Sequence, residues 1–264
     1  MIICTCVKRV LGMICTYWES LLSLRKKRKE LMCLFYVPEI DRCWELDEEE
    51  SQHCVRVLRL TAGDDILLTD GKGNTYQARI TNPHPKHCAF EVLSSEQQVN
   101  KRPYRLHVAI APTKNMDRLE WMVEKCTEIG VDEITPLLCR FSERKVVKTE
   151  RLHKIMVSAA KQSLKAYMPK LNDMCSFEEF VENTSCEQRF IAHCYKDEKR
   201  LLQQELRLAT DVVVLIGPEG DFSEEEVRKA MKRGYVPVSL GESRLRTETA
   251  GVVACHTVAL MNQV

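Results

Sequence analysis

The chain has 264 residues, of which 44% are hydrophobic and 29% are charged, and its formal net charge is +1. This composition is typical of a soluble globular protein with one large or two smaller domains, and it excludes nucleic-acid binding through overall basicity. The 13 cysteines are odd in number and form no CxxC pair, so we expect reduced, mostly buried thiols and a cytoplasmic protein. His84, His87 and Cys88 favour a surface turn over a metal site, and no metal is expected.

Residues 1–31 contain the apolar stretch VLGMICTYWESLLSL, which the basic run RKKRK follows. A signal peptide has its positive charge before the apolar region, which is the opposite order. Fifteen residues are also fewer than the roughly 20 that span a bilayer. We therefore expect no membrane association, with a membrane anchor as the less favoured alternative.

The segment from residue 32 to residue 100 is rich in predicted β-strands. Its elements are a strand at 34–37, a helix at 47–58, a glycine-turn hairpin at 64–80 and a strand at 88–93. This order predicts a small barrel-like domain. The polar stretch 94–103 includes a proline near its end and is the candidate linker.

From residue 104 onward, strands and helices alternate. The predicted strands are 104–112, 133–138, 189–194, 211–217 and 235–240. The predicted helices are 115–130, 149–167 and one that begins with a capping box at Ser223 and Glu226 and ends at Gly234. Such alternation predicts a mainly parallel sheet covered by helices on both faces.

Two loops follow apolar strands and open helices, at LIGPEGDFSEEE (215–226) and SLGESRLRTETAGVVA (239–254). A glycine turn at the carboxyl end of a parallel strand is a common ligand site. The first loop matches neither dinucleotide nor Walker patterns, and Glu219 and Asp221 favour a cationic or neutral ligand over phosphate. Taken alone, this loop is explained by a tight turn, but the two loops together predict a pocket.

These two loops resemble those of the knotted SPOUT methyltransferases, and specifically of the RsmE family, which methylates N3 of a uridine in small-subunit (16S) ribosomal RNA. Three further segments support the resemblance in the same order along the chain: HCVRVLR (53–59), EKCTEIGVDEITPL (124–137) and AAKQSLKAYMP (159–169). The resemblance covers residues 32–264 and leaves 1–31 as an extension without a counterpart, which we expect to be disordered or to result from an upstream start.

The resemblance implies an α/β protein with a PUA-like RNA-binding barrel at 32–100 and a SPOUT domain with a deep trefoil knot at 101–264. It implies S-adenosylmethionine as the methyl donor, a homodimer, and small-subunit rRNA or the assembled 30S subunit as the partner. By the same analogy, the cofactor-binding residues are Gly217, Pro218, Glu219, Gly220, Leu240, Gly241, Leu245, Arg246 and Thr247. Two positions depart from the family, since Asp221 stands where a third glycine is more usual and Lys165 stands where an arginine is usual.

Arg246 is the candidate catalytic residue, because a guanidinium near the uridine oxygens would stabilise the charge left when the N3 proton is removed. Arg244 is the nearby alternative, and Glu219 is the candidate proton acceptor. In the alternative interpretation, Arg246 only braces its loop by pairing with Glu248 or Glu219.

The candidate RNA-binding residues come from two segments. In the first, arginines and a histidine recur every three residues, although a solvated helix face is the plainer explanation. The second, residues 140–170, holds nine lysines and arginines against two glutamates. The candidates are His53, Arg56, Arg59, Arg144, Lys148, Arg151, Gln162 and Lys165. Tyr104, Trp121 and Tyr167 could stack on bases, but core packing is favoured for each.

Two other functions stay open at this point. One is a SPOUT methyltransferase that modifies ribose or another base. The other is an RNA-binding assembly factor that has lost catalysis, although the intact Gly-Pro-Glu-Gly and Arg-Thr-Glu-Thr loops argue against it.

Overall fold

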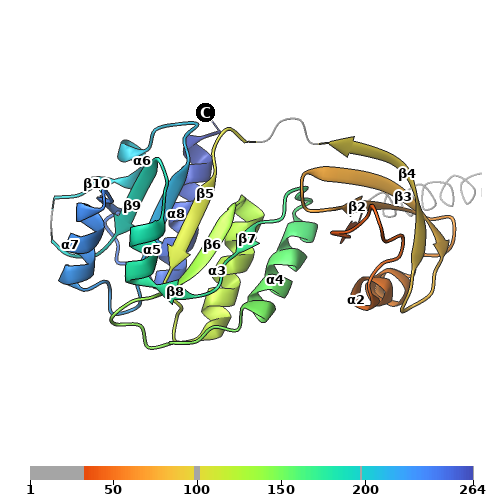
Figure 1. Ribbon diagram of the computed structural model, residues 1–264, viewed down its shortest axis with the longest axis horizontal. Helices are drawn as coiled ribbons and strands as arrows, with labels where there is room; N and C mark the ends of the chain where they lie inside the picture. The colour runs from red at the N-terminus through yellow and green to blue at the C-terminus, as the bar shows by residue number, and fades with distance from the viewer. Residues whose placement is uncertain (1–32, 98–101, 197, 264) are drawn as a thin grey trace, which may run out of the picture.

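The computed structural model describes residues 33–97, 102–196 and 198–263. The predicted extension at 1–31 and part of the predicted linker at 94–103 lie outside this described part. Figure 1 shows the chain as two units side by side, each built on its own sheet.

The amino-terminal unit contains a four-stranded sheet in the order β1-β2-β3-β4. Its strands are β1 (Leu34–Tyr36), β2 (Asp65–Thr69), β3 (Asn74–Asn82) and β4 (Ala89–Gln97). The predicted hairpin is confirmed, because β2 and β3 pair antiparallel across the glycine-rich turn. β4 extends to Gln97, into the predicted linker, because its last residues continue the ladder with the beginning of β3.

The segment that follows β1 also reaches the other edge of this sheet. Leu46 N donates to Cys88 O at 2.9 Å, and Phe90 N donates to Trp44 O at 3.1 Å. A short α2 (Glu48–Gln52), capped by Asp47, then leads into the π-helix η1 (His53–Val57). The strand path does not close on itself among the described residues, so the barrel stays a prediction.

The carboxyl-terminal unit contains an eight-stranded sheet. Its neighbouring strands pair in parallel, as predicted. Its main path is β10-β12-β9-β11-β5-β6-β7, with β8 paired to β6. The strands are β5 (Leu106–Ile110), β6 (Glu133–Leu138), β7 (Lys170–Leu171), β8 (Cys175–Ser176), β9 (Gln188–Ala192), β10 (Arg200–Leu201), β11 (Val212–Ile216) and β12 (Val236–Ser239).

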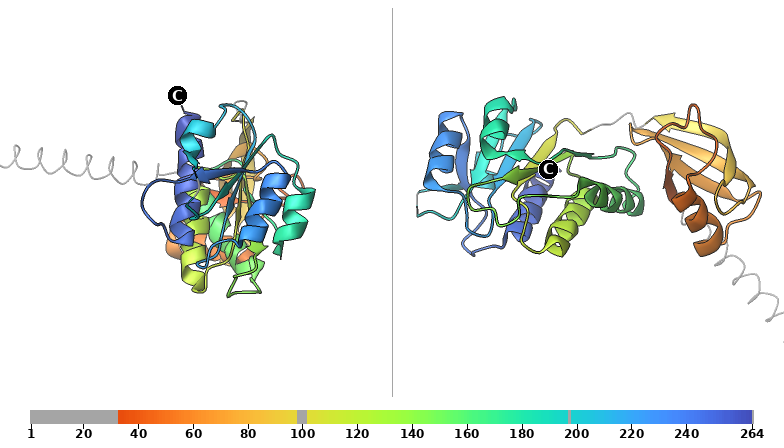
Figure 2. Two further views of the ribbon diagram at one scale, coloured as in Figure 1. Left: turned by 90° about the vertical axis from the view of Figure 1, so that its left-hand side faces the viewer. Right: turned by 60° about the horizontal axis from the view of Figure 1, so that its bottom comes forward.

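Helices cover both faces of this sheet, as the sequence predicts. They are α3 (Met116–Ile129), α4 (Thr149–Gln162), α5 (Phe177–Asn183), α6 (Leu202–Glu205), α7 (Glu224–Lys232) and α8 (Thr247–Met261). Side chains of α3, α4, α6 and α8 pack into one core, and those of α5 and α7 pack into the other. The end-on view of Figure 2 shows α8 and α5 on opposite sides of the sheet.

Strand β11 explains why the sequence there is continuously apolar. Val212, Val214 and Ile216 face the core under α3 and α8, whereas Val213 and Leu215 face the core under α5 and α7. A strand buried on both faces needs apolar residues at every position. Among the residues that the structure describes, no helix is long and apolar enough to cross a membrane.

Helix ends follow the sequence signals with one exception. α3 ends at Gly130, whose φ of 116° is left-handed, and α7 begins with the capping box of Ser223 and Glu226. α4 ends at Gln162, five residues before the predicted end at Tyr167. Leu164 takes a φ of +53°, which leaves the following residues extended toward the amino-terminal unit.

Candidate cofactor and RNA site

The Gly-Pro-Glu-Gly turn lies at the carboxyl end of β11, beside the end of its neighbour β9. Asp221 N donates to Pro218 O at 2.9 Å, which closes the turn. Gly217 is buried, and a Cβ there would lie 3.1 Å from both the ring and the backbone nitrogen of Phe222. A side chain at this position would require Phe222 to shift, so glycine suits a chain that turns this closely over the ring.

Asp221 stands at the position where the family that the chain resembles more often has a third glycine. Its φ is +66°, a left-handed conformation that glycine adopts readily and aspartate tolerates better than most residues. Its carboxylate accepts hydrogen bonds from Phe222 N at 2.8 Å and from Cys194 N at 2.7 Å. Asp221 thus ties the turn to the end of β9, which a glycine could not do.

The second loop connects β12 to α8 and ends at Arg246, the N-cap residue of that helix. α8 then packs closely on the sheet and on α3. A Cβ at Gly251 would lie 3.0 Å from Ile110 Cδ1 and 3.1 Å from Met122 Cγ. This close approach accounts for the small residues that follow the loop in the sequence.

A cavity of about 360 Å³ lies between these two loops. Six of the predicted cofactor residues line it: Gly217, Pro218, Glu219, Leu245, Arg246 and Thr247. The other three predicted cofactor residues, Gly220, Leu240 and Gly241, do not line this cavity. Gly220 abuts Phe141, Leu240 packs against the core, and Gly241 is exposed with a φ of 132° that shapes the loop.

The cavity also has lining residues outside the predicted cofactor set: Arg118, Ala192, Cys194, Ile216, Asp221, Arg244 and Ala250. Ala192 and Cys194 come from the end of β9, and the rule that ligands bind at the carboxyl ends of parallel strands could have found them. Arg118 comes from the first turn of α3, and no local motif marks it.

Charged groups are arranged unevenly around the cavity. Glu219 Oε1 accepts a hydrogen bond from Lys114 N at 2.8 Å, which fixes the direction of this exposed carboxylate. Arg246 is exposed, and among the described residues no ion pair involves it. Glu248 instead lies 3.8 Å from Arg118 Nε with its side chain only 8% exposed. The pairing that would make Arg246 a loop brace is therefore not formed.

The comparisons with known proteins agree with this geometry. A model of the RNA methyltransferase domain matches residues 100–259, which is more than half of the chain, and a model of the RNA methyltransferase PUA domain matches residues 46–93. Ribosomal RNA small subunit methyltransferase E of Synechocystis is 31% identical over 208 residues, which cover 75% of this chain and 67% of that protein. This chain belongs to the RsmE family.

Solved structures of similar proteins extend the match over both units of this RsmE-family chain. A probable rRNA-methyltransferase from Porphyromonas gingivalis is 42% identical, with a TM-score of 0.83 over 88% of this chain and 99% of that one. Ribosomal RNA small subunit methyltransferase E from Neisseria gonorrhoeae, solved bound to S-adenosyl methionine, is 29% identical. Its TM-score is 0.74, over 85% of this chain and 95% of that one.

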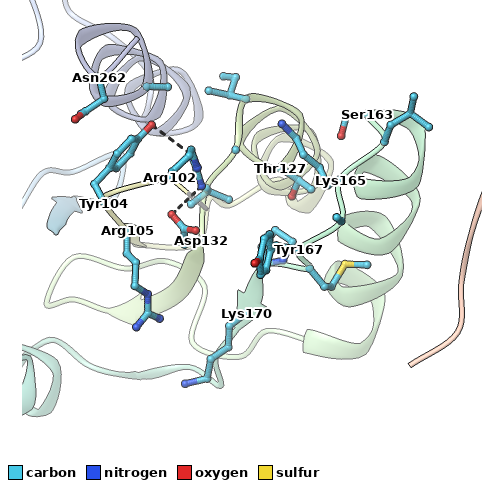
Figure 3. Close-up of a pocket in the computed structure, with 18 of the residues that line it drawn as sticks. Arg102, Tyr104, Arg105, Thr127, Asp132, Ser163, Lys165, Tyr167, Lys170 and Asn262 are labelled. Atoms are coloured by element: carbon cyan, nitrogen blue, oxygen red, sulfur yellow. Dashed lines mark hydrogen bonds and ion pairs between the residues drawn. The ribbon is translucent and has the colours of Figure 1, made fainter. Parts of the chain in front are cut away.

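A larger cavity of about 570 Å³ lies at the opposite end of the sheet, before β5 and after the last turns of α3 and α8 (Figure 3). Arg102 and Lys165 converge there, since a Cβ at Gly130 would lie 3.0 Å from Arg102 Nη1 and 3.7 Å from Lys165 Nζ. Arg102 pairs with Asp132 at 2.9 Å. Burial, and then the charge of Arg102, lower the pKa of Lys165. The smaller cavity lies between the two predicted loops at the carboxyl ends of parallel strands, where such sheets bind ligands, and it is therefore the candidate cofactor site.

The first group of RNA-binding candidates in this RsmE-family chain does not share one helical face. His53, Arg56 and Arg59 are exposed, but the segment is a π-helix, in which a spacing of three does not repeat on one side. Arg59 lies beyond the helix with a φ of +57°. Their RNA contact stays a prediction that rests on exposure and charge.

The second group divides into braced and open side chains. Arg144 donates to the carbonyl oxygens of Thr113 at 3.3 Å and Lys114 at 2.7 Å. Arg151 pairs with Glu120 at 2.6 Å. Lys148, at the beginning of α4, is exposed and has no ion-pair partner among the described residues. Lys148 is therefore more available than Arg151 for contact with an RNA phosphate.

Gln162 is the last residue of α4, and Lys165 follows it at the edge of the larger cavity. Of the three aromatic candidates, Tyr104 is buried, as core packing requires. Tyr167 contacts Gly73 in the turn between β2 and β3. Trp121 is 44% exposed, so core packing does not account for it.

Proposed function

We propose that this chain transfers the methyl group of S-adenosylmethionine to N3 of a uridine in the 16S RNA of the small ribosomal subunit. The single observation that carries the proposal is the cavity between the Gly-Pro-Glu-Gly turn and the Arg-Thr-Glu-Thr loop. Glu219 and Asp221 of its turn suit a cationic cofactor, and Gly217 lets the turn pack directly on Phe222. Two similar proteins solved with this cofactor, the Neisseria gonorrhoeae methyltransferase E and a putative methyltransferase from Legionella pneumophila, support the assignment.

In this proposal, the six lining residues Gly217, Pro218, Glu219, Leu245, Arg246 and Thr247 hold the cofactor, which supplies an electrophilic methyl group when bound. The chain's own residues then stabilise the negative charge that develops on the uridine base. Removal of the uridine imide proton leaves negative charge on N3 and on the neighbouring carbonyl oxygens. Arg246 is available to stabilise that charge, since it forms no ion pair with a carboxylate of the described residues.

Glu219 is our proposed acceptor for the imide proton. Its Oε1 is held by Lys114 N at 2.8 Å, which leaves the second carboxylate oxygen for the substrate. A positioned carboxylate within hydrogen-bond reach of the proton is the first requirement of a general base.

The alternative is an RNA-binding assembly factor without catalysis, and cofactor binding separates the two. Isothermal titration of the purified protein with S-adenosylmethionine is expected to show saturable binding at one site per chain. Absence of binding by the folded protein would favour the assembly factor.

We also propose the knotted topology, a cytoplasmic location and a homodimer formed through the carboxyl-terminal unit. α8 presents Val252, Val253 and Leu260 at least partly to solvent, and Leu260 is 50% exposed. Such a partly exposed apolar face is typical of an interface. Light scattering at micromolar concentration is expected to give twice the chain mass, whereas a monomer mass would contradict the dimer.

The open lysine of the basic segment supports a further prediction about RNA binding. Lys148→Ala is expected to weaken RNA affinity and to flatten the dependence of log K on log salt by roughly one phosphate contact, a slope change of about 0.7–0.9. Arg151→Ala is the matched comparison and is expected to change the slope less, because Glu120 already pairs with that arginine. Equal salt slopes for Lys148→Ala and wild type would remove Lys148 from the RNA contact.

A further inference from the structure

The two units are joined by a backbone contact in addition to the covalent linker. The turn between β2 and β3 pairs with the extended segment that follows α4. Gly73 N donates to Ala166 O at 3.0 Å, Met168 N donates to Gly71 O at 2.8 Å, and Thr69 Oγ1 donates to Ala166 O at 3.1 Å. We call these two segments, 69–74 and 166–168, the joint. It explains why α4 ends before Tyr167.

The turn is shaped for this contact. Asp70 Oδ1 accepts from Lys72 N at 2.7 Å and from Asn74 N at 3.2 Å, which holds the turn in one conformation. Gly73 has a φ of +102°, and a Cβ there would lie 2.2 Å from Tyr167 Cζ. Any side chain at position 73 would therefore collide with the tyrosine that enters the joint from the other unit.

A buried ion pair crosses the same boundary. Glu50 of α2 pairs with Lys161 of α4, and their side chains are only 8% and 21% exposed. Burial raises the pKa of Glu50, and Lys161 opposes that rise. Glu49 and Lys154 form a second pair at 3.1 Å on the same two helices, but both side chains are more than 70% exposed.

Buried ion pairs add little net stability, because desolvation offsets the attraction, and their best-attested role is to fix one geometry against others. Interfaces between domains of one chain ordinarily allow relative motion. Here, the Glu50–Lys161 pair connects α2 to α4, and the joint connects the β2–β3 turn to the segment after α4. The helical segment that carries Glu50 continues directly into His53 and Arg56, so fixing Glu50 also fixes where these exposed cations point.

We propose that the joint and the Glu50–Lys161 pair are positioning elements that hold the amino-terminal unit at one distance and angle from the methyl-transfer cavity. This inference rests on the proposed function, because the object being positioned is the RNA. An RNA bound by the basic residues after α2 then presents one nucleotide to the cavity. Selection of the target is set by this geometry as well as by contacts within the cavity.

The test uses the full chain and two independent variants with matched controls. Lys161→Met leaves Glu50 without its cation, and Glu49→Gln, which removes the exposed ion pair between the same two helices, is its control. Gly73→Ala introduces the collision with Tyr167. Gly63→Ala is its control, because Gly63 also has positive φ but no atom lies within 4 Å of its added Cβ. The reciprocal exchange Glu50→Lys with Lys161→Glu tests rescue.

Three readouts are measured for each protein: small-angle scattering, affinity for S-adenosylmethionine, and methylation of unmodified small subunits with mapping of the modified base. Lys161→Met and Gly73→Ala are expected to change the scattering profile and to leave cofactor affinity within twofold. Methylation of the wild-type target is expected to fall at least tenfold in kcat/KM, with methyl groups appearing at other nucleotides. The controls are expected to match wild type, and the exchange is expected to recover most of the loss.

Unchanged scattering in both variants would show that these residues do not fix the domains. Changed scattering with unchanged rate and target would show that domain geometry does not position the RNA. Failure of the wild-type protein to methylate small subunits would instead contradict the proposed function. The small-angle scattering comparison would still decide whether the joint holds the two units in one arrangement.

Discussion

Arg246→Ala is expected to slow single-turnover methylation by roughly 100- to 1000-fold, the usual cost of removing one donor that stabilises developing charge. Affinity for S-adenosylmethionine is expected to stay within a few-fold of wild type. The reason is that Arg246 is exposed and makes no ion pair with any residue that the structure describes, so its removal leaves the other five predicted cofactor residues of the cavity in place. Rapid-quench assays with enzyme in excess over RNA measure this rate directly.

Arg244→Ala is the comparison variant, since Arg244 lines the same cavity two residues earlier. A smaller loss is expected there. If Arg244→Ala proved the slower enzyme, the charge-stabilising role would belong to Arg244. If Arg246→Ala lowered cofactor affinity and thermal stability together, Arg246 would be a loop brace after all.

Phe222→Ala is expected to cost about 3–5 kcal/mol in the free energy of unfolding, the range for deleting a buried aromatic ring. Phe222 is 0% exposed, and its ring centroid lies 5.4 Å from that of Phe177. The same ring lies directly under Gly217 in the Gly-Pro-Glu-Gly turn. Because the turn loses its support, affinity for S-adenosylmethionine is expected to fall with stability.

Phe141→Ala is the matched control for this effect. Phe141 also contacts the turn, through Gly220, but it is 48% exposed. Its removal is expected to change stability by no more than about 0.5 kcal/mol, as for most surface positions. Urea unfolding curves, compared by their midpoints at constant slope, measure both variants. Equal shifts for the two variants would contradict a supporting role for Phe222.

Much of the carboxyl-terminal fold could be predicted from the sequence because its signals are local. The five apolar residues of β11 follow from burial on both faces, and the capping box at Ser223 follows from the needs of a helix end. Gly130 similarly marks the end of α3 through its left-handed φ. These patterns need no knowledge of distant contacts.

The features that escaped prediction depend on contacts between distant segments. α4 stops early because residues 166–168 pair with a turn almost a hundred positions away. Arg118 reaches the cavity only because α3 packs beside α8. The π-helix after α2 has no period that distinguishes it from an α-helix over five residues. Sequence reasoning located the two loops of the site, but packing decides which residues line it.

The most direct test of the account is nucleoside mass spectrometry of small-subunit RNA after reaction with this protein and S-adenosylmethionine. The substrate is 30S subunits from a strain that lacks its own enzyme of this family, and the modified position is mapped in the same sample. We expect one 3-methyluridine per RNA molecule, and none when Arg246→Ala replaces the wild-type protein for a single short incubation. A ribose-methylated nucleoside, a methylated guanosine, or no transferred methyl group would contradict the proposed function.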